Sequence, residues 1–436
     1  MRSLRSRFVY LVLVFALVLV PAAGAQYADL YTLDLVLAPS IDHSVAVRGI
    51  DIAADVLDNT EFLGLALPEG AVLTATRSGV ERRAYGMTWR GFLDTGDRVV
   101  ITRHKGLLAG AFWLDGRVFE IQPNGGAHLL VELDPASFPP CATGADQVVD
   151  NLSDVVPPSH PKLDEGHHHA SHAHHAIHRD HGGAVTEGGT VNMDVMVVYT
   201  PQARAAAGGT ASIEATSQAA VDASNTGFID SEGDGRFTLV HAFETAYNDS
   251  NSLNVDLNWV ANNAEVAEKR DLYGADMVGL IVENGGGGCG IGFVMRNPGP
   301  GFAGSAFQVT DRGCAVGNLT YAHEHGHNMG LEHDPANSSA FPNSASYPYS
   351  FGHFVSGSYR TIMSYSNQCV GGCTRVAHWS NPDIDHNGVP TGIAGQRHNQ
   401  LAGNQTAPIV ALFETAPVFI DGFESGDTTS WSSTVD

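Results

Sequence analysis

The string HEHGHNMGLEHD at residues 323–334 constrains this chain more than any other feature. His323 and His327 are four residues apart, and on a helix this spacing places both side chains on one face. Two imidazoles placed in this way can bind one metal ion, and Glu324 beside the first of them can reach a water on that metal. The string therefore predicts a helix over residues 319–330 that carries two metal ligands and a general base.

The pattern continues past the helix. Gly330 falls three residues after His327, and a glycine there can adopt a positive φ that ends the helix and turns the chain back. His333 follows three residues later and can complete a three-histidine site. Three neutral imidazoles that leave one position for water form the ligand set of a catalytic zinc ion. The full string H-E-x-x-H-x-x-G-x-x-H therefore predicts a Zn²⁺ site.

A third element is Met363, within the sequence TIMSY at residues 361–365. The zinc string and this methionine together resemble the metzincin zinc peptidases, in which a methionine in a tight turn packs beneath the metal. Asp334, directly after the third histidine, is similar to the residue found there in the reprolysin-like (adamalysin-like) group. Tyr365 is instead similar to the astacin and serralysin pattern, in which such a tyrosine approaches the zinc. Stretches similar to those of bacterial secreted members of the reprolysin-like group lie at 194–204, 289–293 and 381–392.

The resemblance covers about residues 189–415 and implies an α/β metzincin catalytic domain with a twisted, mostly parallel sheet, helices and a zinc cleft. It implies that Glu324 is the general base, and that Tyr365 either stabilises the oxyanion or only packs. It also implies that the substrate lies along an edge strand, for which residues 303–311 are the candidate. The loops at about 366–395 are then expected to shape the S1′ pocket.

The function that follows is a secreted zinc-dependent endopeptidase, which hydrolyses peptide bonds of proteins or peptides with a zinc-activated water and a glutamate base. The alternative is a non-catalytic exported metal-binding or surface protein that retains the metzincin fold. Glu324 favours the enzyme, because a zinc-binding relic has no need of the base. The balance of 23 Lys and Arg against 47 Asp and Glu argues against nucleic acid or anionic lipid as a partner. We expect a monomer.

Apolar, β-branched runs alternate with helical patterns after residue 189, which is typical of an α/β domain. His325 lies between the two helical ligands and points to nearly the opposite side of the helix, so we expect it to be exposed or structural. Strands are expected at residues 193–200, 236–245, 277–282 and 306–310, and helices at residues 213–224 and 253–272.

The N-terminus has the pattern of an export signal. Arg2, Arg5 and Arg7 precede the apolar run 8–20, and a small-x-small site follows at Ala23-Gly24-Ala25. We expect residues 1–25 to be a signal peptide of a bacterial secreted protein, with an uncleaved membrane anchor as the alternative. Stable membrane insertion after signal cleavage is not expected.

Composition divides the rest of the chain. Residues 26–150 contain short alternating runs separated by turn residues, which predict a β-rich domain, and the resemblance implies that this is a propeptide. Residues 151–188 are rich in histidine and read either as a plain linker or as a loose metal-capture segment. Residues 189–415 are the expected peptidase domain, and residues 416–436 form an acidic tail rich in Ser, Thr and Gly.

Five cysteines remain to be explained, and export makes disulfides permissible. Four lie beyond residue 285, and sequence proximity favours the pairs Cys289–Cys314 and Cys369–Cys373 among three connectivities. Cys141 is left over. It is either a thiolate ligand from the propeptide that blocks the zinc, or an unpaired thiol or crosslink.

Two stretches, beginning at Asp230 and at Asp383, start like calcium-binding loops but have no glutamate at position twelve. They favour turns, and calcium held by dispersed ligands remains an alternative.

Overall fold

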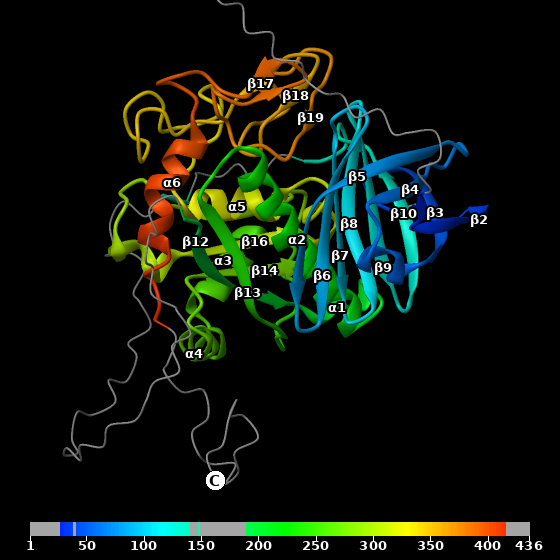
Figure 1. The fold of residues 1–436 in the computed structure, drawn as a ribbon. Helices are drawn as coiled ribbons and strands as arrows, with labels where there is room; N and C mark the ends of the chain where they lie inside the picture. The colour runs from blue at the N-terminus through cyan, green and yellow to red at the C-terminus, as the bar shows by residue number, and fades with distance from the viewer. Residues whose placement is uncertain (1–26, 38–40, 140–146, 149–188, 416–436) are drawn as a thin grey trace, which may run out of the picture.

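The computed structural model describes residues 27–37, 41–139, 147–148 and 189–415. The expected signal peptide, histidine-rich linker and C-terminal tail lie outside these residues, and so does Cys141. Within them the chain forms a ten-stranded sheet, a six-stranded sheet with its helices, and an irregular C-terminal region with small strands (Figure 1).

The first sheet has the strand order β1-β4-β5-β6-β7-β8-β9-β10-β3-β2, and its neighbouring strands are antiparallel except for β1 and β4, which are parallel. Its side chains alternate between two cores, as the period of a strand requires. Val99 and Ile101 face the sheet's own core, while Val100 between them joins the core shared with the rest of the chain. Its strands are β1 (Ala28–Asp29), β2 (Tyr31–Leu37), β3 (Ser44–Ile52), β4 (Phe62–Ala66), β5 (Val72–Arg83), β6 (Gly86–Leu93), β7 (Arg98–His104), β8 (Leu107–Leu114), β9 (Arg117–Asn124) and β10 (Ala127–Leu133).

The second sheet has the order β11-β15-β16-β14-β12-β13. All its pairs are parallel except β15 with β16, so the sheet is mixed and its centre is parallel, as the sequence predicts. Strands at its centre are buried on both faces, which explains their continuous apolar runs. The strands are β11 (Gln147–Val148), β12 (Val191–Tyr199), β13 (Gly235–Glu244), β14 (Met277–Val282), β15 (Gly290–Val294) and β16 (Phe307–Asp311).

The predicted substrate strand at 303–311 is wrong. Its ordered part, β16, lies between β14 and β15, and residues Pro300–Ser305 form a 3₁₀ turn instead. The outer long strand on this side is β15, which sequence reasoning missed because its sequence GIGFV contains two glycines, which are poor strand formers.

The helices lie close to their predicted places. The helix predicted at 253–272 is two helices, because Asn263 adopts an extended conformation and its side chain caps the second by accepting from Val266 N at 3.1 Å. The helices are α1 (Pro201–Ala206), α2 (Thr210–Asp230), α3 (Leu253–Asn262), α4 (Ala264–Tyr273), α5 (Thr320–Asn328) and α6 (Asn399–Val410).

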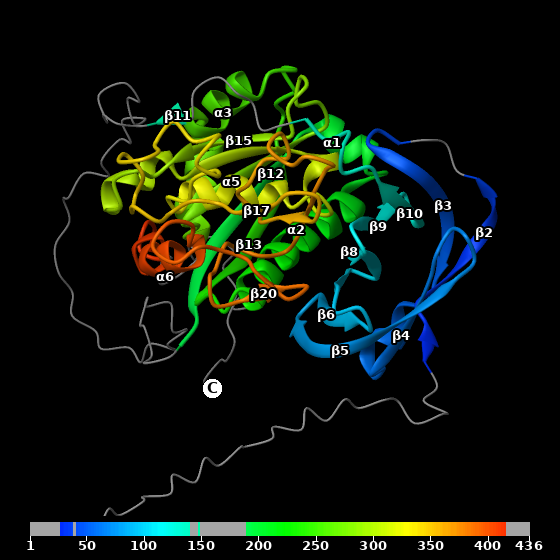
Figure 2. The ribbon, with the colours of Figure 1, turned by 90° about the horizontal axis from the view of Figure 1, so that it is seen from above.

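Helix α2 lies between the two sheets, and the views in Figures 1 and 2 agree on this arrangement. It packs against β7 and β8 on one side and β13 on the other. Its many Ala, Ser, Thr and Gly residues allow both sheets to approach closely, and nearly all of its side chains are buried. The helix that carries the predicted ligands, α5, lies on the far side of α2 from the first sheet (Figure 2).

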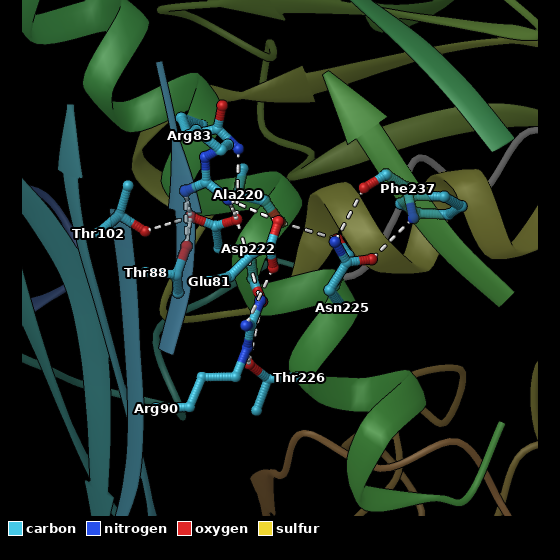
Figure 3. Close-up of polar contacts among 12 residues, drawn as sticks. Glu81, Arg83, Thr88, Arg90, Thr102, Ala220, Asp222, Asn225, Thr226 and Phe237 are labelled. Atoms are coloured by element: carbon cyan, nitrogen blue, oxygen red, sulfur yellow. Dashed lines mark hydrogen bonds and ion pairs between the residues drawn. The ribbon is translucent and has the colours of Figure 1, made fainter. Parts of the chain in front are cut away.

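A polar network joins the first sheet to α2 (Figure 3). The buried Asp222 carboxylate accepts hydrogen bonds from Arg83 Nη2 at 2.8 Å and from the hydroxyls of Thr88 and Thr102, both at 2.6 Å. An anion in this position is stable because charged and neutral donors from the neighbouring strands replace its water. The first sheet is therefore bound specifically to the second part of the chain.

The C-terminal region covers α5 with loops and short strands (Figure 1). The stretch that begins like a calcium loop at Asp383 forms a hairpin, as its turn residues favour. No helix in the described part of the chain is long and apolar enough to cross a membrane. The short strands are β17 (Phe354–Val355), β18 (Tyr359–Arg360), β19 (Thr374–Arg375), β20 (Asp385–His386) and β21 (Val389–Pro390).

Candidate metal centre

Helix α5 ends where the motif requires. Gly330 has φ +81°, and the amides of Gly330 and Leu331 donate to the carbonyls of His327 and Gly326, both at 2.9 Å. This is a Schellman ending, which favours glycine at the left-handed position. A Cβ on Gly330 would also lie 2.7 Å from the carbonyl oxygen of Met295. Glycine is therefore required here, and it turns the chain so that His333 returns towards the helix.

The three predicted ligands come together. Nε2 of His327 lies 2.9 Å from Nε2 of His333, which lies 3.1 Å from Nε2 of His323. All three side chains are buried, and their ligand atoms lie within 4.8 Å of one another. Four-coordinate zinc with Zn–N bonds of about 2.0–2.1 Å places its nitrogens roughly 3.3 Å apart, so the spacing fits a zinc ion within a few tenths of an ångström.

The other ring nitrogens fix the tautomers. Nδ1 of His323 lies 2.8 Å from Ile362 O, and Nδ1 of His327 lies 2.8 Å from Leu331 O. Because a carbonyl oxygen only accepts, each Nδ1 carries the proton and each Nε2 presents a lone pair to the centre. Nδ1 of His333 is similarly directed at Asn337 O, at 3.3 Å. Converging lone pairs repel one another unless a cation lies between them, so these residues fit a metal ion.

The surroundings of His323 disfavour its protonated form. Burial, followed by the charges of Arg375 and of the two neighbouring histidines, lowers the pKa of His323 well below its usual value. A neutral imidazole is the form that binds metal.

Glu324 lies beside strand β15. The strand has glycine at 290, and a Cβ there would lie only 2.7 Å from Oε1 of Glu324 and 2.8 Å from its Cγ. This glycine therefore makes room for the carboxylate between the helix and the outer strand. The helix is held against the same strands by Asn328, whose Nδ2 donates to Phe293 O at 2.9 Å and to Phe307 O at 3.0 Å. No motif in the sequence indicated the role of Asn328.

Asp334 connects the third histidine to the methionine turn. Its carboxylate accepts from the backbone N of Tyr365 at 3.0 Å, from Ser364 Oγ at 3.1 Å and from Asn337 Nδ2 at 2.9 Å. The ring of Tyr365 lies against His333, with 4.2 Å between centroids. The structure thus places Tyr365 next to the candidate ligands, where it packs against the ring of His333.

Met363 lies beneath the helix. A Cβ on Gly326 would be 2.6 Å from the Met363 sulfur and 3.0 Å from the ring of Trp379, so both side chains pack directly onto the helix backbone. The sequence analysis expected His325 to be either exposed or structural. The structure shows that it is buried, which agrees with the structural alternative. It packs against Tyr321 and Phe237 because the sheet covers that side of the helix.

Two disulfides flank the centre. Cys289 pairs with Cys314 at the start of β15, and Cys369 pairs with Cys373 in the loop after Tyr365.

Two arginines near the centre were missed by sequence reasoning. Arg360 and Arg375 are neighbours on strands β18 and β19, and both are buried. Neither belongs to a recognisable motif, and their sequence separation conceals the pairing.

Comparison with known proteins agrees with this centre. The sequence profile of Metallo-peptidase family M12 matches residues 189–380. Over 419 residues the chain is 31% identical to the peptidyl-Asp metalloendopeptidase of Stenotrophomonas maltophilia (strain R551-3), covering 90% of this chain and 91% of that protein. The chain belongs to metallopeptidase family M12. The relative of the same name from Xanthomonas campestris pv. campestris is 28% identical, with 90% of this chain and 91% of that protein covered.

Among solved structures, metalloproteinase-II from Bacteroides fragilis matches with a TM-score of 0.38 and 12% identity, covering 68% of this chain and 88% of that chain. Membership of family M12 rests on the sequence relatives. It identifies the chain as a metalloendopeptidase of a zinc-dependent family, so the prediction of an enzyme is confirmed and the non-catalytic alternative is set aside.

Proposed function

We propose that this M12 metallopeptidase is an exported zinc endopeptidase, made with an inhibitory N-terminal region, that cleaves proteins beside aspartate. The observation that carries the proposal is the convergence of the Nε2 atoms of His323, His327 and His333, with Glu324 directly after His323 in helix α5. The aspartate preference comes from the relatives, which are named peptidyl-Asp metalloendopeptidases.

Each residue of the site has its own role in the proposed reaction. A zinc ion held by His323, His327 and His333 would supply the Lewis acidity that polarises the peptide carbonyl and acidifies a water. Glu324 takes the proton from the attacking water and returns it to the leaving amine. Burial of the carboxylate beside Gly290 keeps it in place and excludes bulk water, which strengthens its action on the reacting atoms. Tyr365 lies against His333, and we propose that its hydroxyl stabilises the developing oxyanion.

The N-terminal region contacts the strand that a substrate would use. Residues Gln147 and Val148 of β11 pair in parallel with Phe293 and Val294 of β15. A peptide bound by strand addition to β15 would need the same backbone groups. This competition supports a propeptide role for residues 26 to about 188. Removal of this region would then be required for activity.

Cys141 lies outside the described residues, and we propose it as a thiolate ligand that blocks the metal before processing. Cys141→Ser in the unprocessed chain would then raise cleavage. Unchanged cleavage would leave β11 as the blocking element.

The catalytic proposal is tested by cleavage of casein after removal of the N-terminal region. Wild type should cleave, a zinc chelator should abolish cleavage, and Glu324→Ala should reduce it at least roughly 1,000-fold while zinc stays bound. Glu265→Ala, on the exposed side of α4, is the control for loss of one carboxylate. Chelator-insensitive cleavage, or none at all, would contradict the proposal.

Export and processing are tested together by N-terminal sequencing of the protein recovered from culture medium. A start at Gln26 in an immature form and near residue 189 in the active form would agree with the proposed signal peptide and propeptide. An active form that still begins near residue 26 would contradict the propeptide.

A further inference from the structure

We propose that Asn328 is a positioning residue for substrate binding. Its side-chain amide holds strand β15 against helix α5, and the ring of His325 fixes the direction of that amide. The inference rests on the proposed function, in which a substrate peptide adds to β15. It deepens that function by naming the residues that hold the substrate strand in place relative to the candidate metal ligands.

The side chain of Asn328 connects helix α5 to two strands at once. Its Nδ2 atom donates to Phe293 O of β15 at 2.9 Å and to Phe307 O of β16 at 3.0 Å. Because a carbonyl oxygen only accepts, both hydrogens of the amide are used and Nδ2 must face the strands. The Oδ1 atom then points the other way, towards His325, and lies 3.1 Å from Nδ1 of that ring.

The ring of His325 is held in the matching tautomer. An amide oxygen also only accepts, so Nδ1 of His325 carries the proton and donates it to Asn328 Oδ1. If the amide were turned over, a donor would face a donor here and an oxygen would face the two carbonyls. Both side chains are fully buried, where such unmade hydrogen bonds are costly. His325 therefore selects the one orientation of the amide that binds both strands.

Strand β15 runs directly along helix α5. A Cβ on Gly292 would lie 2.8 Å from Glu324 O, so the two backbones are in contact at that point. The backbone N of Met295, just past the end of the strand, donates to His327 O at 3.0 Å. Phe293, whose carbonyl accepts from the amide, lies between these two contacts. The strand is thus held in place relative to the proposed base and one candidate ligand.

The Asn328 amide supports the part of β15 that a substrate would use. The ladder between β15 and β16 covers Gly290 to Gly292, and at Phe293 the side-chain amide binds the strand instead. Phe293 and Val294 are the residues that pair with β11. A peptide that replaces β11 would need this segment in the same position to form its backbone hydrogen bonds.

The test compares two internally quenched peptides on the same sample of processed enzyme. Both contain the four residues around one bond that wild type cleaves in casein, and the longer peptide adds three native residues at each end. Because the added residues can form backbone bonds to β15, wild type should cleave the longer peptide roughly 30-fold better in kcat/KM. This ratio does not depend on how much of the sample is folded, so it separates substrate positioning from stability.

Asn328→Leu keeps the size of the side chain and removes the donor. The ratio should fall from about 30 to below about 5, with most of the loss in KM for the longer peptide. Asn225→Leu is the matched control, because the buried Asn225 of α2 donates to Phe237 O at 2.8 Å and holds β13, at the other edge of the same sheet (Figure 3). The control should lower the free energy of unfolding and leave the ratio unchanged. An unchanged ratio in Asn328→Leu would overturn the inference.

His325 is tested by two substitutions. His325→Leu should lower the ratio as well, because the Asn328 amide then has no donor to fix its direction. His325→Asn should restore the ratio, because its amide nitrogen can donate from near the position of Nδ1. Zinc content is measured for each variant, since His325 lies between two candidate ligands. A wild-type ratio in His325→Leu would overturn the role of His325.

If Asn328→Leu does not fold, Gly292→Ala decides. Its methyl group would lie 2.8 Å from Glu324 O, so it pushes β15 away from the helix without removing a hydrogen-bonding side chain. The ratio should fall here too, whereas Gly403→Ala, whose methyl meets only an ordinary contact at 3.7 Å, should leave it unchanged. A wild-type ratio in Gly292→Ala would overturn the inference.

Failure of the proposed function has different signatures. Without the proposed zinc chemistry, neither casein nor either peptide is cleaved in a chelator-sensitive way. If wild type cleaves both peptides equally well, substrates do not add to β15, and the inference is overturned together with that part of the proposed function.

Discussion

The Asp334 carboxylate accepts a hydrogen bond from the backbone N of Tyr365 at 3.0 Å, across 31 residues of sequence. The contact connects the chain directly after the third histidine to the turn beneath the metal centre. Because Asp334 also accepts from Ser364 Oγ, the carboxylate holds the turn at two points. The residue that indicates the subgroup in the sequence is thus a positioning residue in the structure.

We predict that Asp334→Ala lowers zinc affinity and kcat/KM, each by about 10- to 100-fold, which is the usual effect of losing a residue that orients a metal ligand. The loss follows because His333 and Tyr365 are no longer held in place. Chelator competition measures the affinity, and casein cleavage at saturating zinc measures the activity. The control is Asp383→Ala, which removes an exposed carboxylate in the β20 region. Unchanged zinc affinity in Asp334→Ala would show that the turn is held without the carboxylate.

The substitutions Gly326→Ala and Gly403→Ala give a matched pair of predictions about stability. At Gly326 in α5 the new methyl would lie 2.6 Å from the Met363 sulfur and 3.0 Å from Trp379, so both must move. We expect Gly326→Ala to destabilise the protein by about 1–3 kcal/mol. At Gly403 in α6 the nearest atom is Met329 Cε at 3.7 Å, an ordinary contact.

Gly403→Ala should therefore be neutral or stabilise by up to about 1 kcal/mol, because alanine has the higher helix propensity. Urea denaturation of both variants makes the comparison. Equal effects of the two substitutions would mean that the space beneath α5 adapts easily to a methyl group.

The buried carboxylate of Asp222 is predicted to control the attachment of the first sheet (Figure 3). Asp222→Ala leaves Arg83 and the hydroxyls of Thr88 and Thr102 without their common acceptor. Breaking a buried pair of this kind costs about 3–5 kcal/mol. We expect a fall of that size in the free energy of unfolding, and readier release of the sheet after nicking of the chain between residues 149 and 188.

The control for Asp222 is the more exposed ion pair between Lys105 and Glu214, which joins the same sheet and helix at 2.6 Å. Lys105→Met should change the free energy of unfolding by less than about 1 kcal/mol, because exposed pairs contribute little. Equal losses in the free energy of unfolding for Asp222→Ala and Lys105→Met would show that the network around Asp222 does not hold the first sheet in place.

The buried Glu120 is predicted to make the stability of the protein depend on pH. It lies in β9 and accepts from Gly317 N at 2.9 Å, just before α5, and burial raises its pKa from 4.5 to about 7. Between pH 4.5 and 7 the folded chain therefore binds more protons at this group than the unfolded chain does. Stability from Glu120 is present in full below pH 4.5 and falls as the pH rises towards 7.

Glu120→Gln should remove that part of the pH dependence, which is at most a few kcal/mol. Urea denaturation at pH 5 and pH 7.5 measures it as the difference between wild type and variant. Glu61→Gln, at the surface, controls for the loss of one charge. A wild-type slope that survives in Glu120→Gln would assign the dependence to other buried acids, such as Asp230 and Asp276.

Local spacing accounts for what could be predicted. The helical positions of His323, Glu324 and His327 follow from contacts between residues three and four apart, and Gly330 follows from the conformation that ends a helix. The parallel centre of the second sheet follows from continuous apolar runs such as β12 and β14. These features depend on short stretches of chain, so the sequence alone determined them.

Long-range contacts decided the rest. The tautomer of His323 depends on a carbonyl 39 residues away, and the outer strand is β15 because β16 pairs between it and β14. Arg360 and Arg375 become neighbours only when β18 and β19 align. Such contacts bring together residues whose separation in the sequence carries no periodic signal. The string at 323–334 thus determined which three histidines could bind a metal, whereas packing between distant segments decided which residues surround them.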